Sequence, residues 1–351
     1  MRILITGGAG FVGSNLAISI RRRSNHEVVA MDNLYRRGSD LNIPRLRDAG
    51  VEFAWGDVRN PESFPAGPFD VLIECSAEPS VLAGLTGSPD HVYHTNMTGA
   101  YNCLEKARAW KSRFIFMSTS RIYPTAVLEA HLWREDDTRF AWSDNDCRDG
   151  ISSHGVTERT PIGVAGSLYG YTKLSAELLI AEYAQSFGLQ ATINRCGVIA
   201  GPWQFGKSDQ GLASLWVQAH HFGRPLSYIG YGGQGKQVRD FLHVDDLCDL
   251  LSIQVEDPKT WNGWTGNVSG GYDNSASLQE LTLLCQKATG KHVPIKPVTE
   301  NRPADLRLYI GDCDKLFTTT NWRPKHNLEK TIGDTAKWVR DHEAVLALLL
   351  S

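Results

Sequence analysis

A tyrosine and a lysine four residues apart are the first candidates in this chain for proton-transfer chemistry. Tyr169 and Lys173 stand at the start of an apolar-periodic stretch, GSLYGYTKLSAELL at 166–179, which predicts a helix. On a helix their Cβ atoms would lie about 5–6 Å apart. The ammonium group would favour phenolate and so lower the tyrosine pKa. A fall from about 10 to near neutrality requires about 4 kcal/mol. That is more than one neighbour supplies, so we expect a second, bound cation near the phenol.

The elements around this pair alternate between strand and helix. Apolar runs predict strands at 2–6, 27–31, 51–55, 70–75, 113–118 and 190–195, and helices at 11–23, 90–110, 168–187 and 328–350. This order predicts an α/β fold, a Rossmann-type doubly wound parallel sheet with a smaller C-terminal substrate-binding domain. We expect a first domain at 1–195, to which part of about 235–250 returns, and a second at 196–351. Segment 124–166 is expected to be a long loop with a functional role.

A glycine-rich turn follows the first predicted strand and opens the first predicted helix. In TGGAGFVG (6–13), Gly8, Gly10 and Gly13 satisfy G-x-G-x-x-G. Such a turn lets the backbone approach a pyrophosphate at the helix N-terminus. Asp32 ends the second strand, where a carboxylate accepts hydrogen bonds from ribose hydroxyls. The cofactor-binding residues predicted here are Gly7, Gly10, Phe11, Val12, Gly13, Asp32 and Asn33.

The cofactor is predicted to be NAD, and 1–195 would be its domain. The carboxylate of Asp32 would repel the 2′-phosphate of NADP, although Arg36 and Arg37 nearby leave NADP open. The oxidised ring of NAD carries a positive charge. It would therefore be the second cation that the ionised phenol requires.

The sequence contains TGGAGFVG, Asp32, GDVRN (56–60) and Tyr169-x-x-x-Lys173. Together these features resemble the extended short-chain dehydrogenase/reductases, the NAD-dependent sugar-nucleotide epimerase/dehydratase family. The resemblance runs almost from end to end. It implies that Thr119, in MSTSRIY (117–123), is the catalytic hydroxyl beside Tyr169 and Lys173. It also implies further cofactor contacts. Asp57 and Val58 would contact the adenine, and Ala77 and Lys173 the nicotinamide ribose. Asn96 would contact the cofactor from the helix behind it.

The second half of the chain resembles the substrate side of this family, so 196–351 would bind a nucleotide-diphosphate sugar. KQVRDFLHVDD (236–246) and RPADLRLYIGDCDKL (302–316) match segments whose arginines hold the diphosphate. Two features resemble the CDP-paratose 2-epimerase group: the segment PWQFGKSDQG (202–211) and an arginine two places after the threonine. A CDP-sugar is therefore favoured as the substrate. The implied substrate-binding residues are Ser80, Arg121, Gln204, Phe205, Gln210, Gln237, Arg239, Arg302 and Arg307.

The resemblance predicts an epimerase that transiently oxidises a sugar carbinol carbon to a ketone and returns the hydride to the other face. A UDP-hexose 4-epimerase and a nucleotide-sugar reductase or decarboxylase stay open as alternatives. A 4,6-dehydratase is disfavoured because Ser120 and Arg121 replace the acid pair that elimination of water needs. A redox-sensing regulator is disfavoured because the tyrosine and lysine are both present. Two departures from the family pattern are Glu74, where a histidine is common, and Ala200, where a tyrosine is usual.

Composition limits partners and location. The 351 residues carry a net charge of -3, which gives no reason to expect nucleic acid. No apolar run approaches the roughly 18 residues of a membrane span. Seven cysteines without any C-x-x-C predict reduced thiols and a cytoplasmic protein, and no metal site is expected among the histidines. By resemblance, we expect a homodimer or homotetramer that pairs through helices 90–110 and 168–187.

Overall fold

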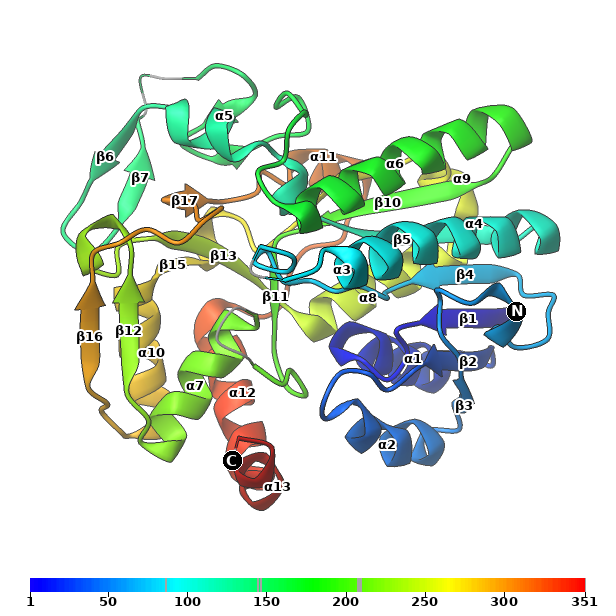
Figure 1. Cartoon of the computed structure of the whole chain (residues 1–351), viewed down its shortest axis with the longest axis horizontal. Coiled ribbons are helices and arrows are strands. Elements are labelled where there is room, and N and C mark those ends of the chain that lie inside the picture. Colours follow the sequence, from blue (N-terminus) through cyan, green and yellow to red (C-terminus); the bar gives the residue numbers. More distant parts are fainter. Residues whose placement is uncertain (86, 144, 146, 207–209, 351) are drawn as a thin grey trace. The chain divides into compact units, whose positions relative to one another are not determined.

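The computed structural model describes residues 1–85, 87–143, 145, 147–206 and 210–350 (Figure 1). The chain folds as two compact units. Unit 1 comprises Met1–Thr119, Ser167–Arg195 and Leu247–Gly266, and unit 2 comprises Ser120–Gly166, Cys196–Asp246 and Asn267–Ser351. These bounds differ from the expected division at two places. Segment 120–166 belongs to the second unit, and the part that returns to the first unit is 247–266 rather than about 235–250.

Unit 1 is built on a seven-stranded parallel sheet in the order β14-β10-β5-β4-β1-β2-β3. The predicted α/β fold with a doubly wound parallel sheet is confirmed. The strands are β1 (Arg2–Thr6), β2 (Glu27–Asp32), β3 (Glu52–Trp55), β4 (Val71–Glu74), β5 (Arg113–Thr119), β10 (Ala191–Cys196) and β14 (Thr265–Val268). Because the strands are parallel, their carboxyl ends share one edge of the sheet, and β1, β4 and β5 are direct neighbours there.

Helices cover the sheet of unit 1. Strand residues such as Leu4, Leu72 and Phe116 pack in one core with the buried sides of α4 and α6, which lie side by side (Figure 1). Residues of the opposite parity, such as Ile3 and Ile73, are fully buried as well, so the other face is also covered. The helices are α1 (Phe11–Arg23), α2 (Asn42–Asp48), α3 (Asp90–Tyr93), α4 (Gly99–Trp110), α6 (Leu168–Phe187) and α9 (Pro258–Trp261), together with most of α8 (Val244–Glu256).

The helix expected at 90–110 is present but contains a π-helical turn. His94–Thr98 separates α3 from α4. One extra residue in a turn shifts the face that follows it, and such turns often mark functional places. The buried Asn96 lies in this turn. The C-terminal helix expected at 328–350 is likewise interrupted, between α12 (Leu328–Asp341) and α13 (Glu343–Leu350).

Unit 2 combines small sheets with helices. In its largest sheet, β13 pairs with β11 and β17 in parallel and with β15 antiparallel. A second pair joins β12 to β16, and the helices pack around a core of their own. The elements are β11 (Val198–Ala200), β12 (Leu226–Ile229), β13 (Val238–His243), β15 (Ser275–Ser277), β16 (Ile295–Val298), β17 (Leu308–Tyr309), α7 (Leu212–Phe222), α10 (Leu278–Thr289), α11 (Asp314–Thr319), α12 and α13.

The long loop expected at 124–166 has structure of its own. It contains α5 (Thr125–Ala130), a hairpin of β6 (Trp133–Glu135) and β7 (Phe140–Trp142), and a hairpin of β8 (Ile151–Ser152) and β9 (Gly155–Val156). Backbone hydrogen bonds fasten both hairpins within unit 2, from Phe140 N–H to the Lys236 carbonyl and from Val156 N–H to the Ile310 carbonyl. The expected long loop therefore contains secondary structure, and its functional role stays a prediction.

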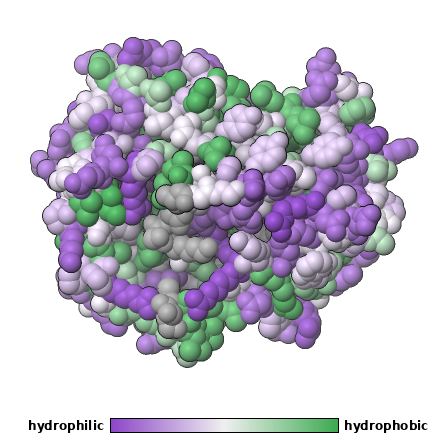
Figure 2. All heavy atoms as spheres, in the orientation of Figure 1, coloured by the Kyte–Doolittle hydropathy of each residue, from purple (hydrophilic) through white to green (hydrophobic). Residues whose placement is uncertain are grey.

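No helix among the described ranges is long and apolar enough to cross a membrane. Hydrophobic side chains nevertheless gather on the surface over α13 (Figure 2). There Val345 and Leu348 are 40% and 71% exposed.

Candidate active site

The glycine-rich turn between β1 and α1 is shaped by close backbone contacts. Gly7 has a φ of 64°, and the Gly10 N–H donates to the Gly7 carbonyl at 2.9 Å. A Cβ on Gly13 would lie 2.2 Å from that same oxygen. Gly10 is the N-cap of α1 and provides no side-chain cap. The first-turn N–H groups, including those of Phe11 and Val12, therefore lack a capping side chain and fit an anionic pyrophosphate.

Asp32 lies at the end of β2, directly beside this turn. Its Oδ2 accepts from Ala9 N–H at 3.1 Å and its Oδ1 from Leu34 N–H at 2.8 Å. Burial raises the pKa of this carboxyl, and the backbone N–H groups oppose that rise. Each oxygen has a second lone pair, so the carboxylate can also accept from ribose hydroxyls. The cradle of the turn and this carboxylate both fit a dinucleotide.

The predicted adenine contacts belong to a local polar cluster. Asp57 accepts from Asn33 at 3.0 Å and from both Nε and Nη2 of Arg59. These bonds, those of Arg59 first, lower the Asp57 pKa to about 2. Val58 is buried, and its carbonyl accepts from Asn102 at 2.8 Å. Asp57 is thus held as an anion at a fixed place in unit 1.

The segment after β4 is tied to the start of α6 through Asn96. The Asn96 Oδ1 accepts from Glu78 N–H at 2.8 Å, and its Nδ2 donates to Thr172 Oγ1 at 3.0 Å. Ala77 lies in this segment, half-buried. Ser80 is buried there, and its hydroxyl accepts from Leu82 N–H. The side chain of Asn96 is thus engaged within the protein, where it positions the two elements on either side of it.

Unit 1 contains all three residues predicted to be catalytic. Thr119 is buried and ends β5. Ser167 caps α6 by accepting from Gly170 N–H at 3.1 Å, so Tyr169 and Lys173 occupy the first two turns of that helix. Tyr169 is half-buried, whereas Lys173 is 3% exposed.

Lys173 lies against a buried carboxylate. Its Nζ is 3.3 Å from Oε2 of Glu74 and 4.4 Å from the centroid of the Phe116 ring. Burial raises the pKa of Glu74, and the charge of Lys173 opposes the rise. The sequence showed this glutamate as a departure in an apolar strand but did not reveal its partner.

A second buried ion pair lies one turn farther along α6. Glu177 pairs with Arg195 of β10, whose Nη2 lies 2.8 Å from Oε2, and both side chains are buried. The hydroxyl of Ser118, next to Thr119, donates to Glu177. The sequence analysis did not predict the Glu177–Arg195 pair. Its visible signal was the four-residue spacing of Tyr169, Lys173 and Glu177, which places three ionisable side chains on one face of a helix.

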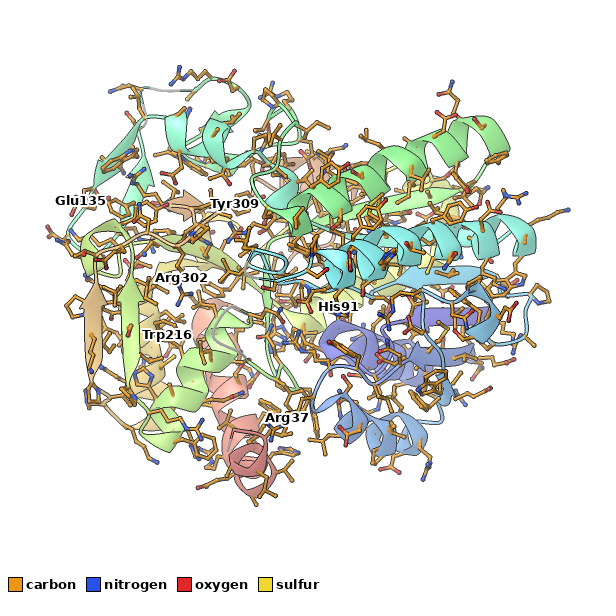
Figure 3. The ribbon with its side chains drawn as sticks, viewed as in Figure 1. Arg37, His91, Glu135, Trp216, Arg302 and Tyr309 are labelled. Atoms are coloured by element: carbon orange, nitrogen blue, oxygen red, sulfur yellow. The ribbon has the colours of Figure 1, made fainter. Side chains whose placement is uncertain are left out.

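The predicted diphosphate arginines lie in unit 2, and two of them have carboxylate partners. Arg239 of β13 donates to Oδ1 of Asp305 at 2.9 Å and to the carbonyls of Val238 and Leu306. Arg121 donates to the Ala304 carbonyl at 2.9 Å. Arg302 is in the segment between β16 and β17 (Figure 3). Arg302 therefore belongs to segment 302–306, and Arg121 and Arg239 both donate hydrogen bonds to residues of that segment.

Arg307 has a different environment. It forms an ion pair with Glu129 of α5, and its guanidinium lies 4.1 Å from the centroid of the Trp133 ring and 4.9 Å from that of Tyr231. The predicted contact with a diphosphate would therefore have to displace Glu129. As the structure stands, this arginine fastens α5 and the β6–β7 hairpin to β17.

The remaining predicted substrate residues are mostly engaged within unit 2. Gln204 donates to the Ile199 carbonyl at 2.9 Å and accepts from Ser214 at 2.9 Å, and the ring of Phe205 packs on Trp338. Gln237 donates to the Ile229 carbonyl, while its Oε1 is buried with no hydrogen-bond partner among the described residues. Gln210 is half-buried. Residues 207–209 of the same predicted loop lie outside the described residues.

One group of side chains has the composition of a metal site. Within the described ranges, donor atoms of His243, Asp245 and His326 lie within 4.8 Å of one another. However, Nδ1 of His243 accepts from Asp245 N–H at 3.0 Å, and Nδ1 of His326 bonds Asp246 at 2.9 Å. Both nitrogens are already used by the protein, and the expectation of no metal stays a prediction.

Comparison with known proteins agrees with this geometry. Residues 3–264 match the NAD dependent epimerase/dehydratase family. The chain belongs to this family. The predictions of an NAD-dependent enzyme of this family, and of NAD as its cofactor, are confirmed.

Relatives within the family have several activities. The chain is 29% identical to the CDP-paratose 2-epimerase of Salmonella typhi, over 96% of this chain and 99% of the relative. It is 28% identical to the dTDP-glucose 4,6-dehydratase of Mycobacterium tuberculosis, over 98% and 95%. Its structure is similar to that of the UDP-glucose 4-epimerase of Thermus thermophilus in complex with NAD, with a TM-score of 0.77, 25% identity and coverage of 97% and 99%.

Proposed function

We propose that this chain is an NAD-dependent epimerase of a nucleotide-diphosphate sugar, most similar to CDP-paratose 2-epimerase. The arrangement within unit 1 supports the proposal: β5 ends at Thr119, and α6 begins one residue before Tyr169. The dinucleotide turn follows β1, which β4 separates from β5 in the same sheet. The carboxyl edge of an open parallel sheet is the usual ligand-binding place of such folds.

The proposed chemistry is transient oxidation of a sugar hydroxyl. When bound, NAD⁺ supplies a hydride acceptor, held by the turn of Gly7, Gly10 and Gly13 and by Asp32. Tyr169, as phenolate, takes the proton of the hydroxyl group, and Thr119 donates a hydrogen bond to the same oxygen. The positive charge of Lys173 favours the phenolate. The ketone then presents its other face, and Tyr169 returns the proton when the alcohol is restored.

On the substrate side, Arg239 is the main candidate for the diphosphate. Its guanidinium is fixed in β13 by two carbonyls and by Asp305, and a phosphate would take the place of the Asp305 carboxylate as its charge-assisted partner. Arg302 or Arg307 would be the second diphosphate contact, and Arg121 a further substrate contact. A CDP-sugar is favoured because the Salmonella relative is a CDP-paratose 2-epimerase.

The dehydratase relatives are almost as similar to this chain, and two positions favour an epimerase over a dehydratase. Elimination of water requires acids immediately after the catalytic hydroxyl, and this chain has Ser120 and Arg121 there. The second candidate function is a UDP-hexose 4-epimerase, which shares the proposed catalytic residues and is favoured by the likeness to the Thermus enzyme. A reductase or decarboxylase of the same family would differ in needing added reductant or in releasing CO₂.

We also propose that the chain forms a homodimer or homotetramer through α3–α4 and α6. Large side chains on these helices are exposed: Tyr93 and Tyr101 on the first, Leu178 and Phe187 on the second, at 48–59%. Apolar side chains exposed on neighbouring helices are typical of protein interfaces. A cytoplasmic location is proposed from the cysteine content alone. Analytical ultracentrifugation at micromolar chain concentration tests the oligomeric state, and a monomer there would contradict it.

The function is tested by product analysis. The purified chain is incubated with CDP-, UDP- and GDP-hexoses without added cofactor, and products are identified by NMR. We expect epimerisation of a CDP-sugar at C2 and, in deuterated water, no deuterium at that carbon, since the hydride returns internally. A 4-keto-6-deoxy product would identify a dehydratase, and deuterium at C2 would replace the hydride route by deprotonation.

A further inference from the structure

The side chain of Lys173 enters a closed site inside unit 1. Its partner Glu74, 3.3 Å away, comes from the end of β4 and is 1% exposed. Phe116, whose ring lies under the ammonium group, is the register partner of Glu74 on β5. On the other side of Glu74, the register partner on β1 is Thr6. Three adjacent strands and α6 thus surround one ammonium group and one carboxylate.

Among the described residues, no second anion balances the lysine within this site. The titratable group that faces the pair from α4 is the thiol of Cys103, whose pKa burial raises well above its usual range, so it is neutral. Along α6, Tyr169 is one turn before Lys173. Phe116 and Cys103 belong to the apolar core that also contains Leu72, Phe114 and Ala176.

We propose that Glu74 is the counter-ion that keeps Lys173 protonated in this buried place, and that it is therefore a positioning residue for the proton transfer at Tyr169. The catalytic part of this inference rests on the proposed function. A buried ammonium group without a partner loses its proton several pH units below the usual value. A neutral amine has no charge with which to favour phenolate. The aromatic ring contributes to holding the cation but carries no counter-charge.

The test compares three variants. Glu74→Gln removes the charge and keeps the shape and an acceptor oxygen, and Glu74→Asp keeps the charge. Glu177→Gln is the matched control, since it breaks the other buried pair of α6, whose cation Arg195 does not titrate in this range. In the pH profile of kcat/KM, we expect the basic limb of E74Q to move down by about two pH units relative to the parent. The limbs of E74D and E177Q should stay within about half a unit of the parent, the scatter that a merely structural change produces.

A second measurement does not depend on activity. In E74Q the lysine is buried without a counter-ion, and burial then disfavours its charged form relative to the unfolded chain. The folded state then binds fewer protons, so stability rises with pH. The stability deficit of E74Q relative to the parent, from urea unfolding, should narrow from pH 7 to pH 10, whereas that of E177Q should not.

These results separate the two proposals. A parent chain without epimerase activity would refute the proposed function, and the denaturation series would still decide the role of Glu74. An unchanged basic limb in an active E74Q, or a deficit constant with pH, overturns the role of Glu74. If E74Q is unfolded at pH 7, the proposal requires that it regain its fold towards pH 10, and a chain unfolded at both pH values overturns it.

Discussion

Replacing Gly13 by alanine should force the cofactor turn away from helix α1. The new Cβ would lie 2.2 Å from the Gly7 carbonyl oxygen and 2.9 Å from Cα of Gly8. Real Cβ atoms essentially never come within 3.0 Å of such atoms, so turn and helix must separate by about 0.8 Å. Because the atoms it meets belong to the backbone, no side-chain rotation relieves the contact.

We expect this substitution to lower the free energy of unfolding by about 2 kcal/mol, as overpacking does elsewhere. That is about a 30-fold change in the ratio of folded to unfolded chains. NAD should bind about 100-fold more weakly, because a displacement near 1 Å takes the first-turn N–H groups of α1 out of line with the pyrophosphate.

Urea unfolding measures the first quantity, and fluorescence titration of the cofactor-free chain with NAD measures the second. Gly10→Ala is the matched control, since its Cβ would lie 3.0 Å from the same Gly7 oxygen and needs only a small adjustment. It should lose less than half as much stability as G13A. A G13A chain that binds NAD within about twofold of the parent, with stability changed by no more than about 0.5 kcal/mol, would refute the reasoning.

Three further predictions concern proton transfer, the diphosphate and pH. Tyr169→Phe should lower kcat by about 10³-fold while the chain retains NAD after dialysis, and unchanged turnover would exclude the phenol. Arg239→Ala should raise KM for the nucleotide sugar about tenfold or more with a smaller effect on kcat, and an equal fall in kcat alone would contradict diphosphate binding. Burial raises the pKa of Asp240 to about 6. Its folded pKa therefore exceeds its unfolded value, and the stability it contributes is present near pH 4 and lost as pH rises through 6. Urea midpoints from pH 4 to 7 should show this loss in the parent, and Asp240→Asn should flatten it; a parent-like slope in that variant would assign the titration to another group.

The local part of the site was predictable because its signals are local. The turn 7–13 and Asp32 are fixed by contacts between adjacent segments, such as Gly8 N–H with the Met31 carbonyl at 2.9 Å. Glycine spacing, strand length and helix periodicity report such contacts directly. The predicted strand at 2–6 and helix at 11–23 agree with β1 and α1 to the residue.

The secondary structure of segment 124–166 was not predicted, because the contacts that form it join residues distant in the chain. Its strands are two or three residues long, too short for any periodicity to show. They form because distant backbone meets them, as Lys236 meets Phe140 and Ile310 meets Val156. The partner of Arg307 was likewise hidden, because Glu129 is 178 residues away in the chain, and the contact of Arg307 with a diphosphate stays a prediction. Residue type alone does not distinguish a guanidinium that is already paired from one that is open to ligand.

The two buried ion pairs of α6 also join segments that are distant in the chain, and they have a functional consequence. Lys173 and Glu177 are one turn apart on the helix and pair with opposite charges, Glu74 on β4 and Arg195 on β10. Buried pairs contribute little net stability compared with apolar residues of similar volume, so stability alone does not account for them here. The pairs fix the orientation of α6, because each pair forms only at one rotation of the helix about its axis. Lys173 and Glu177 cannot exchange partners, because each would then face a like charge. Tyr169 is one turn before the first pair, so the same constraint that orients the charges also orients the phenol.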